Sequence, residues 1–317
     1  MQTGVVLALA LLVALAIDRR WGEPSVRWHP VVWMGRALQK AGDATAPTEP
    51  TGVDMVSFWR AALCWCVLAV IAVVIAGALQ YAVLRYAPWW LGFILLGALL
   101  KPMLAWRMLR SESLAVESAL AHSLQDGQAQ LARLVSRDVT VLSAVQVRES
   151  AIESLAENLN DSVVAPIFWF LVAGLPGAVL YRFANTADAM WGYPGMRGGR
   201  YWQWAGKWAA RADDVLSWIP ARITAAALWL VTKGVSWSAL VSNARATPSP
   251  NSGWPMAAMA LALNVRLSKP GVYVLNADGD DAAAGDLLRA DTFATRAVFC
   301  VVVLAVLCLI SLLVVRV

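Results

Sequence analysis

The sequence predicts an all-α, polytopic integral membrane protein with about five or six apolar helices, one of which can be re-entrant, joined by long helical polar loops. Of its 317 residues, 59% are hydrophobic and only 15% are charged, and the mean hydropathy is +0.59. Spanning helices need about 20 mostly apolar residues, and the strongest runs are Phe58–Gln80, Pro88–Trp106, Ala221–Val241 and Ala297–Val315. We expect residues 1–317 to form a single membrane-embedded domain.

The first apolar run, Gly4–Ile17, is short, and residues 14–16 resemble a signal-peptide cleavage site. Its charges favour a retained helix, because no Lys or Arg precedes it while Arg19 and Arg20 follow it. Since positive residues stay on the cytoplasmic side, we expect the N-terminus outside and residue 18 in the cytoplasm.

A second weak run, Val163–Leu180, contains two prolines and two glycines. Such breaks are tolerated in a membrane where other protein satisfies the freed backbone groups, so we expect a broken or re-entrant helix. Strict alternation of all runs places residues 182–220 on the opposite side from residues 107–162. A re-entrant segment places them on one side.

Cysteine and tryptophan usage excludes several classes of site. The four cysteines lie inside apolar runs, where helix packing is the expected role, so we expect no disulfide framework and no iron–sulfur site. Many of the 17 tryptophans stand at the ends of apolar runs, which suits membrane interfaces rather than nucleic acid.

A polar insert, residues 107–162, carries an acidic stripe in which Glu149, Glu153, Glu157 and Asp161 recur every four residues. On a helix this spacing stacks like charges on one face, which destabilises an isolated helix by roughly 0.2–0.5 kcal/mol per pair. We therefore expect a positive group to face the stripe. Two further polar loops, residues 182–220 and 242–295, are expected to contribute to the same site.

Four clusters of polar and small residues stand beside the apolar runs: Trp28–Arg36, Asn185–Tyr193, Ala210–Arg222 and Pro248–Pro255. A lone histidine near a helix start, such as His29, is more often a structural hydrogen-bonding group than a catalyst. Asn185 and Asp188 are three residues apart, which places them on one helical face, with a helix cap as the alternative.

The third cluster sets adjacent carboxylates, Asp213 and Asp214, between Arg211 and Arg222. Adjacent side chains on a helix point in different directions, so we expect one carboxylate to join the common site and the other to pair with an arginine. The fourth cluster, around Asn251, is a stiff turn whose backbone donors suit an anion, and a plain surface turn is equally consistent.

Carboxylates, amides and arginines at a membrane surface match what phosphate and magnesium need. Mg²⁺ is usually held by one or two carboxylates together with substrate phosphates, and arginine grips phosphate oxygens in two-point contacts. The sequence contains neither a GxxxxGK[ST] phosphate loop nor a GxGxxG fingerprint. It therefore excludes the common nucleotide-binding motifs and predicts an uncommon scaffold.

Seven blocks in a fixed order are more specific than any single motif. They are the opening apolar run with GEP (22–24), HPVVWMGR (29–36), ESLAENLNDSVVAPIFW (153–169), GLPGAVLYRFANTAD (174–188), GY (192–193), ARADDVLSWIPAR (210–222) and PSPNSGWPMAAMA (248–260). In this order the chain resembles the adenosylcobinamide-phosphate synthase family of cobalamin biosynthesis, called CobD or CbiB, over most of its length.

The resemblance implies a multi-pass enzyme of the cytoplasmic (inner) membrane that acts as an ATP-dependent carbon–nitrogen (acid–amine) ligase. Such an enzyme joins the propionate carboxylate of adenosylcobyric acid, a corrinoid, to the amine of aminopropanol phosphate or a related amino-alcohol phosphate. ATP is then the co-substrate and Mg²⁺ the metal. Membrane lipid and other cobalamin-assembly enzymes are the expected surroundings and partners, with no nucleic acid.

Charge and spacing suggest a role for individual residues in such a ligase. Glu153, Glu157 and Asp161 are predicted to hold magnesium, and the predicted catalytic carboxylates are Glu157, Asp188 and Asp214. Either aspartate can serve as a second carboxylate arm or as the base that deprotonates the amine. The predicted substrate-binding residues are His29, Arg36, Asn158, Asn185, Arg211, Arg222 and Asn251.

Two other classes fit parts of the sequence. A membrane transporter uses broken helices around a polar midplane site, but here the charges gather in the connections rather than within the apolar runs. A membrane sensor protein similar to the AmpE family shares the fold in outline, but the blocks around residues 185, 210 and 248 look like the synthase. Ala189 and the segment 194–201 depart from the synthase pattern and bear on the choice of amine.

Overall fold

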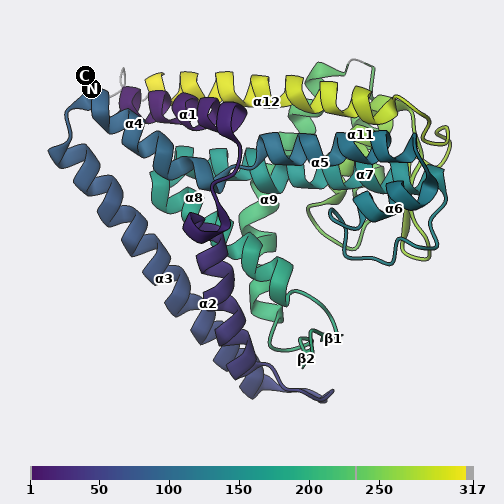
Figure 1. Ribbon diagram of the computed structural model, residues 1–317, viewed down its shortest axis with the longest axis horizontal. Coiled ribbons are helices and arrows are strands. Elements are labelled where there is room, and N and C mark those ends of the chain that lie inside the picture. Colours follow the sequence, from purple (N-terminus) through teal and green to yellow (C-terminus); the bar gives the residue numbers. More distant parts are fainter. Residues whose placement is uncertain (1, 233, 312–317) are drawn as a thin grey trace. The chain divides into compact units, whose positions relative to one another are not determined.

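The computed structural model describes residues 2–232 and 234–311, and their regular structure is almost entirely helical, as predicted (Figure 1). Within these residues, five helical segments are long and apolar enough to cross a membrane: Met55–Tyr86, Trp89–Leu120, Ala144–Trp191, Lys207–Val231 and Asp286–Ser311. The chain divides into two compact units. The first comprises residues 1–104, 165–216 and 305–317, and the second comprises residues 105–164 and 217–304.

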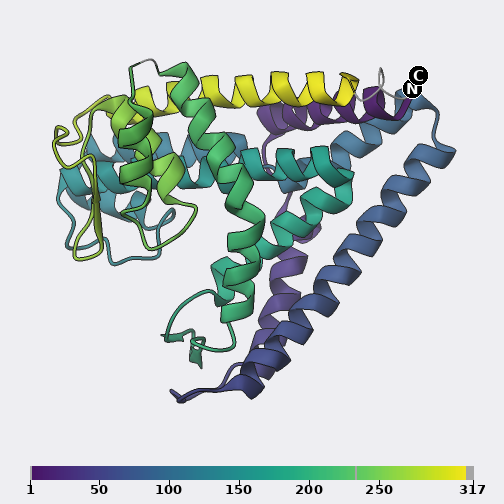
Figure 2. The same ribbon diagram turned by 180° about the vertical axis from the view of Figure 1, so that it is seen from behind.

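The first unit is built from helices and one very short hairpin. Its elements are α1 (Gln2–Trp21), the 3₁₀ turn η1 (Val26–Trp28), α2 (Pro30–Thr45), α3 (Met55–Tyr86), α4 (Trp89–Leu100), the 3₁₀ turn η2 (Lys101–Met103), α8 (Ala165–Trp191), β1 (Met196–Arg197), β2 (Arg200–Tyr201) and the first part of α9 (Lys207–Val231). Helices α1 and α4 lie side by side (Figures 1 and 2). Gly97 permits this approach, because a Cβ there would stand 2.8 Å from the carbonyl oxygen of Ala10.

Aromatic side chains fill the core of the first unit. Trp65 of α3 meets Phe183 of α8 edge to face at 5.5 Å, and Trp191 at the end of α8 stacks on Trp202 at 5.8 Å. All four side chains are buried, and they belong to one apolar cluster. The cluster fixes α8 against α2 and α3, because aromatic pairs of this geometry add to the burial of their surface.

The predicted interruption of the Val163–Leu180 run is confirmed. Helix α8 changes direction at Ala173 and Gly174, and Gly174 has φ +66° and ψ −152°, a combination essentially restricted to glycine (Figure 2). The backbone N–H of Leu175, which begins the second part, donates to Oε1 of Gln80 in α3 at 2.7 Å. A polar side chain from a neighbouring helix thus satisfies a group that the break frees.

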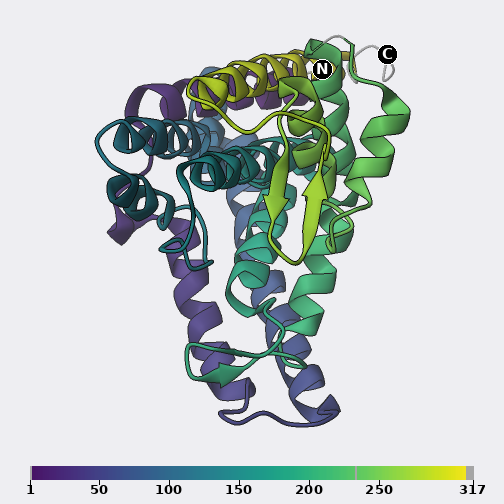
Figure 3. The ribbon, with the colours of Figure 1, turned by 90° about the vertical axis from the view of Figure 1, so that its right-hand side faces the viewer.

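The second unit combines helices with an antiparallel hairpin. Its elements are α5 (Trp106–Leu120), α6 (Leu124–Leu131), α7 (Ala144–Leu159), the π-helical turn η3 (Asn160–Val164), the rest of α9, α10 (Trp237–Ala244), α11 (Gly253–Leu263), β3 (Leu267–Lys269), β4 (Tyr273–Leu275) and most of α12 (Asp286–Ser311). Helix α7 packs against α5, α6, α11 and β3. Figure 3 shows the β3–β4 hairpin as a pair of antiparallel arrows.

Two predicted helix limits are wrong. The run Pro88–Trp106 is not one helix, because α4 ends at Leu100 and is followed by a 3₁₀ turn that contains Pro102. The run Ala221–Val241 is not one helix either, because α9 ends at Val231 and Val241 belongs to α10. In both cases a continuous apolar composition conceals a change of backbone direction.

Residues 182–220 and 242–295 contain helices and strands and are not simple loops. The first segment includes the end of α8 and the start of α9, and α9 continues past Pro220 without ending there. A proline has no N–H to give to the carbonyl four residues earlier, and here that carbonyl, Leu216 O, accepts from the indole Nε1–H of Trp169 at 2.9 Å. Trp169 therefore supplies the hydrogen bond that Pro220 cannot.

Candidate functional site

Helix α7 in the second unit carries most of the acidic stripe. Ser143 begins it with a capping box, in which its Oγ accepts from the N–H of Gln146 at 3.3 Å and Gln146 Oε1 accepts from the N–H of Ser143 at 2.9 Å. Glu149 and Glu153 are each only 2% exposed, and Glu157 is half-buried. Two carboxylates of the stripe are therefore inside the unit rather than on its surface.

A positive group does face the stripe, as predicted. Arg137, in the turn between α6 and α7, donates from Nη2 to Oε2 of Glu153 at 2.7 Å. Glu149 instead accepts from the hydroxyl of Ser268 in β3 at 2.6 Å and from its N–H at 3.2 Å. Each buried carboxylate thus has its own partner, which offsets the cost of burying a charge.

The β3–β4 hairpin closes over this acidic face. Burial raises the pKa of Tyr273 in β4, and the negative charge of Glu153 and a hydrogen bond with it raise that pKa further. The phenol is therefore a neutral donor beside the carboxylates at physiological pH.

The four-residue spacing predicts that one α-helix carries the stripe as far as Asp161, and this is wrong. Helix α7 ends at Leu159, and Asp161 lies in the π-helical turn η3. There Asn160 donates from Nδ2 to Oδ1 of Asp161 at 2.8 Å, and Asn160 Oδ1 accepts from the hydroxyl of Thr224 in α9 at 3.2 Å. Turns of this kind occur often at functional sites because they redirect side chains.

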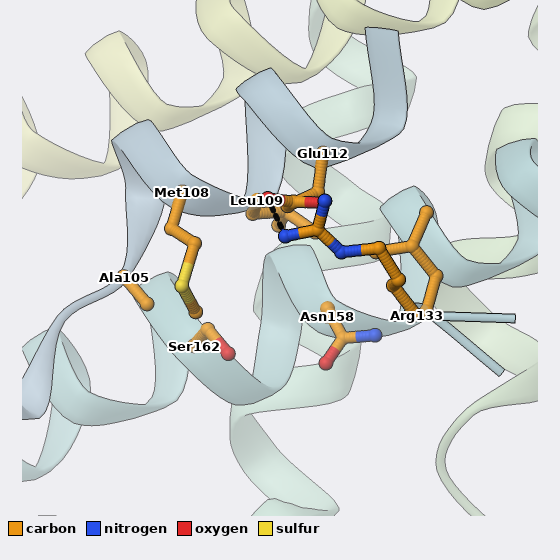
Figure 4. A pocket seen from close by; sticks show the side chains of 8 residues that line it. Ala105, Met108, Leu109, Glu112, Arg133, Asn158 and Ser162 are labelled. Carbon is orange, nitrogen blue, oxygen red and sulfur yellow. Dashed lines mark hydrogen bonds and ion pairs between the residues drawn. The ribbon is translucent and has the colours of Figure 1, made fainter. Parts of the chain in front are cut away.

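A pocket of about 280 Å³ opens beside α7 within the second unit (Figure 4). Asn158 and Ser162 line one side of it, and Met108 and Glu112 of α5 line another. Arg133 reaches across from the chain after α6 and donates from Nη2 to Oε1 of Glu112 at 2.9 Å (Figure 4). The pocket thus presents an amide, a hydroxyl, a carboxylate and a guanidinium to a small polar ligand.

Sequence reasoning found only part of this pocket. Asn158 was predicted as a substrate-binding residue, whereas Glu112 and Arg133 were not. Both lie in the polar insert, but 21 residues separate them and no local spacing pairs them. They come together because the chain turns back after α5, so that α6 and the residues after it run alongside α5.

Arg222 and Asn251, both predicted to bind substrate, are brought together in the second unit. Arg222 donates from Nη1 to Oδ1 of Asn251 at 2.9 Å and from Nη2 to the carbonyl of Pro250 at 3.1 Å. Its guanidinium also lies over the rings of Trp218 and Trp254, at 4.3 and 4.8 Å from their centroids. The arginine is held rigidly by these contacts.

The other predicted residues belong to the first unit. Asn185 and Asp188 are half-buried on α8, and Gly192 leaves room for Asp188, since a Cβ there would stand 2.0 Å from its Oδ1. Arg211 is exposed and Asp214 is half-buried on α9. Arg36 is exposed on α2. Their assigned roles stay predictions.

His29 has a structural position in the first unit. It caps α2, where its Nδ1 accepts from the N–H of Val31 at 3.3 Å, and its Nε2 lies 3.0 Å from Oε2 of Glu23. Burial raises the pKa of Glu23, but hydrogen bonds and charges from His29 and Lys101 outweigh it, so this pKa lies below its ordinary 4.5. A substrate contact for His29 stays a prediction.

Lys101 is a buried cation that sequence reasoning missed. Its side chain is 2% exposed, and its Nζ lies 2.8 Å from Oε1 of Glu23 and 3.1 Å from Oδ1 of Asp18, and donates to the carbonyl of Leu104 at 3.2 Å. The available signal was a lone lysine inside the apolar run Pro88–Trp106, because ionisable groups in such runs are rarely left without a partner.

No set of three or more His, Cys, Asp or Glu side chains among residues 2–232 and 234–311 is placed to hold a metal ion. Glu153 in particular is bound to Arg137. The magnesium ligands therefore stay a prediction, in which two carboxylates and substrate phosphates are enough.

Comparison with known proteins gives one consistent family. The model of the CobD/Cbib protein family matches residues 11–299. The probable cobalamin biosynthesis protein CobD of Methanothermobacter thermautotrophicus is 41% identical over 274 residues, which cover 84% of this chain and 85% of the relative. The cobalamin biosynthesis protein CobD of Chromobacterium violaceum is 41% identical over 268 residues, covering 82% and 81%.

A more distant relative covers more of the chain. The cobalamin biosynthesis protein CobD of Brucella suis is 35% identical over 304 residues, which cover 89% of this chain and 86% of the relative. No solved structure matches. The match of residues 11–299 includes every predicted site residue, and the chain belongs to the CobD/Cbib family.

Proposed function

We propose that the chain is the adenosylcobinamide-phosphate synthase of cobalamin biosynthesis and lies in the cytoplasmic (inner) membrane. The observation that carries the proposal is the family match over residues 11–299. The five apolar helical segments suit the membrane location. The transporter and the AmpE-like sensor are not favoured, because the matching family and the named relatives all belong to cobalamin biosynthesis.

The proposed reaction is an ATP-dependent amide synthesis. The propionate carboxylate of adenosylcobyric acid takes the γ-phosphoryl group of ATP, which yields ADP and an acyl phosphate. The amine of aminopropanol phosphate then attacks the acyl carbon, the C–N bond forms, and inorganic phosphate leaves. The amine arrives as an ammonium ion and must first lose a proton to a base, for which Asp188 and Asp214 are the candidates.

The second unit contains carboxylates and an arginine that suit this reaction. Glu157 and Asp161 would hold Mg²⁺, which neutralises phosphate oxygens, and hard oxygen ligands of this kind suit that ion. Glu153 fits less well, because Arg137 already occupies Oε2 at 2.7 Å and its positive charge opposes a cation there. Arg222 is partly exposed and is held by Asn251, which suits binding of a phosphate.

The pocket beside Asn158 suits the smaller substrate. Its Glu112 carboxylate and Arg133 guanidinium offer opposite charges to the ammonium and the phosphate of an amino-alcohol phosphate. Arg133 has an exposed side chain, so its pair with Glu112 can open at little cost.

The test is conversion by the purified protein in detergent of adenosylcobyric acid and aminopropanol phosphate to adenosylcobinamide phosphate, with and without ATP and Mg²⁺. Product formed only with both supports the ligase and the metal requirement. Absence of product with tight corrinoid binding points to another amine. Absence of both product and corrinoid binding contradicts the proposal.

A further inference from the structure

The first unit contains a second, larger hollow that the proposed chemistry does not use. It has a volume of about 560 Å³ and is lined by η1, α2, α3, α4, η2 and α8. Every lining side chain is aliphatic, aromatic, proline or methionine. We call this hollow the α3 groove.

The α3 groove opens on a surface that faces the surrounding medium. Its α3 wall includes Ile71, Ile75 and Leu79, whose side chains are 49%, 55% and 43% exposed. Helix α3 is the longest and most apolar of the single-helix spans, and only 22% of its most apolar stretch is buried inside the protein. In a membrane such a surface lies against lipid.

Two of the lining residues, Trp28 and Trp33, differ from the rest. They have exposed indole rings, as tryptophan does where a membrane meets water. The indole N–H of Trp33 donates to the carbonyl of Arg27 at 2.9 Å, so the ring is held in place. The guanidinium of Arg27 lies 5.4 Å from the ring centroid of Trp28. Among the described residues, no carboxylate forms an ion pair with Arg27.

We propose that the α3 groove binds one acyl chain of an anionic phospholipid, with the headgroup phosphate at Arg27. Water does not fill such a space well, because a bound water needs two to four polar partners and this lining offers almost none. An acyl chain needs none, and membrane lipid is the apolar medium at the open side. The guanidinium of Arg27 can bind the phosphate oxygens of a headgroup at two points. Its unpaired charge favours a headgroup of net negative charge, such as phosphatidylglycerol, over phosphatidylcholine, in which the choline cation offsets the phosphate.

The first test counts bound lipid. The wild-type protein and two variants are purified in mild detergent, incubated with vesicles of phosphatidylglycerol and phosphatidylcholine, re-purified and measured by native mass spectrometry. Ala72→Phe fills the groove, and Ala78→Phe is the control, because Ala78 is on the same helix, exposed and outside the groove. We expect one retained phospholipid per chain in the wild type and in Ala78→Phe, and at least a fivefold loss in Ala72→Phe.

The second test concerns the headgroup. Arg27→Gln is compared with Arg85→Gln, because Arg85 is also exposed and also stacks on its neighbouring aromatic ring, at 5.7 Å from Tyr86. We expect the ratio of retained phosphatidylglycerol to phosphatidylcholine to fall several-fold in Arg27→Gln alone. No retained lipid in the wild type, equal retention in Ala72→Phe, or an unchanged ratio in Arg27→Gln would each overturn the proposal. Matching thermal melts of all four variants establish that they are folded.

Discussion

At the scale of single residues, the buried carboxylates of the acidic stripe are stabilised by individual partners. Glu153 has a side chain only 3% exposed, and Arg137 is its ion-pair partner at 2.7 Å. Removing one partner of a buried pair leaves the other charge uncompensated, which is costlier than removing an exposed pair. The sequence predicted that a cation was needed but could not say which one, because Arg137 is 16 residues away across a turn.

Arg137→Met should therefore destabilise the protein by about 3 kcal/mol, the low end for a broken buried pair because Arg137 is itself partly exposed. Arg133→Met, in the same connection, is the matched control and should cost less than about 1 kcal/mol, since Arg133 is 62% exposed. Thermal unfolding in detergent measures both. Adding Glu153→Gln to Arg137→Met should recover much of the loss, and equal losses in the two single variants would contradict this account.

Glu157→Gln and Asp214→Asn test the catalytic assignment. Each should lower turnover by roughly 100-fold, the usual scale for a catalytic acid, base or charge-stabilising group, without lowering the melting temperature. Glu117→Gln is a control, because Glu117 pairs with Arg148 and does not line the pocket. Turnover is measured as adenosylcobinamide phosphate formed per chain. If both variants fold and turn over normally, the assignment is wrong.

Glu23 should give the protein a pH dependence of known sign. Its folded pKa is lowered from 4.5, so its stabilising effect is fully present above about pH 4.5 and is lost as the pH falls through the folded pKa. Melting temperatures of wild type and Glu23→Gln should therefore differ at pH 7 and converge below about pH 4.5. A difference that stays constant over this range would show that the carboxylate contributes through packing alone.

At the scale of elements, composition predicted which segments are apolar but not where each helix ends. The capped start of α7 at Ser143 and the break in α8 have local causes in the sequence. The end of α4 at Leu100 also has a local marker, because Pro102 follows it, whereas the passage of α9 through Pro220 depends on the distant Trp169. Such distant partners are invisible to a local pattern.

The break in α8 gives a prediction at this scale. Gly174→Ala should destabilise the protein by about 1–3 kcal/mol, because its φ of +66° is strained for other residues. A Cβ there would also stand 2.3 Å from Oε1 of Gln80. Gly52→Ala is the control, since a Cβ at Gly52 meets nothing within 4 Å and its φ is not positive. Equal thermal stability of the two variants would show that the break does not require glycine.

At the scale of the whole molecule, the fold class and the family followed from the sequence, whereas the division into two units did not. Unit boundaries fall within apolar and polar segments alike, so no linker composition marks them. The predicted site residues are likewise divided, with Glu157, Asn158 and Arg222 in the second unit and Asp188 and Arg211 in the first.

The orientation of α1 is the prediction that belongs to the whole chain. In a variant with all four cysteines replaced, Thr3→Cys and Trp21→Cys place exposed thiols near the two ends of α1. We expect a membrane-impermeant maleimide to label the first in intact spheroplasts and the second only after permeabilisation, because positive residues stay in the cytoplasm. The reverse pattern would invert the assigned topology.

The indole of Trp169 makes two positions depend on each other. In Trp169→Phe, the Leu216 carbonyl loses its indole donor, and Pro220 has no N–H to replace it. This loss costs about 1–3 kcal/mol if the carbonyl stays buried. In a background with Pro220→Ala, the restored backbone N–H can serve that carbonyl, and the same Trp169→Phe change should cost less. The two sites are thus energetically coupled through the Leu216 carbonyl, without any need for contact between their side chains. The change in unfolding free energy from either substitution alone therefore does not equal the contribution of that residue.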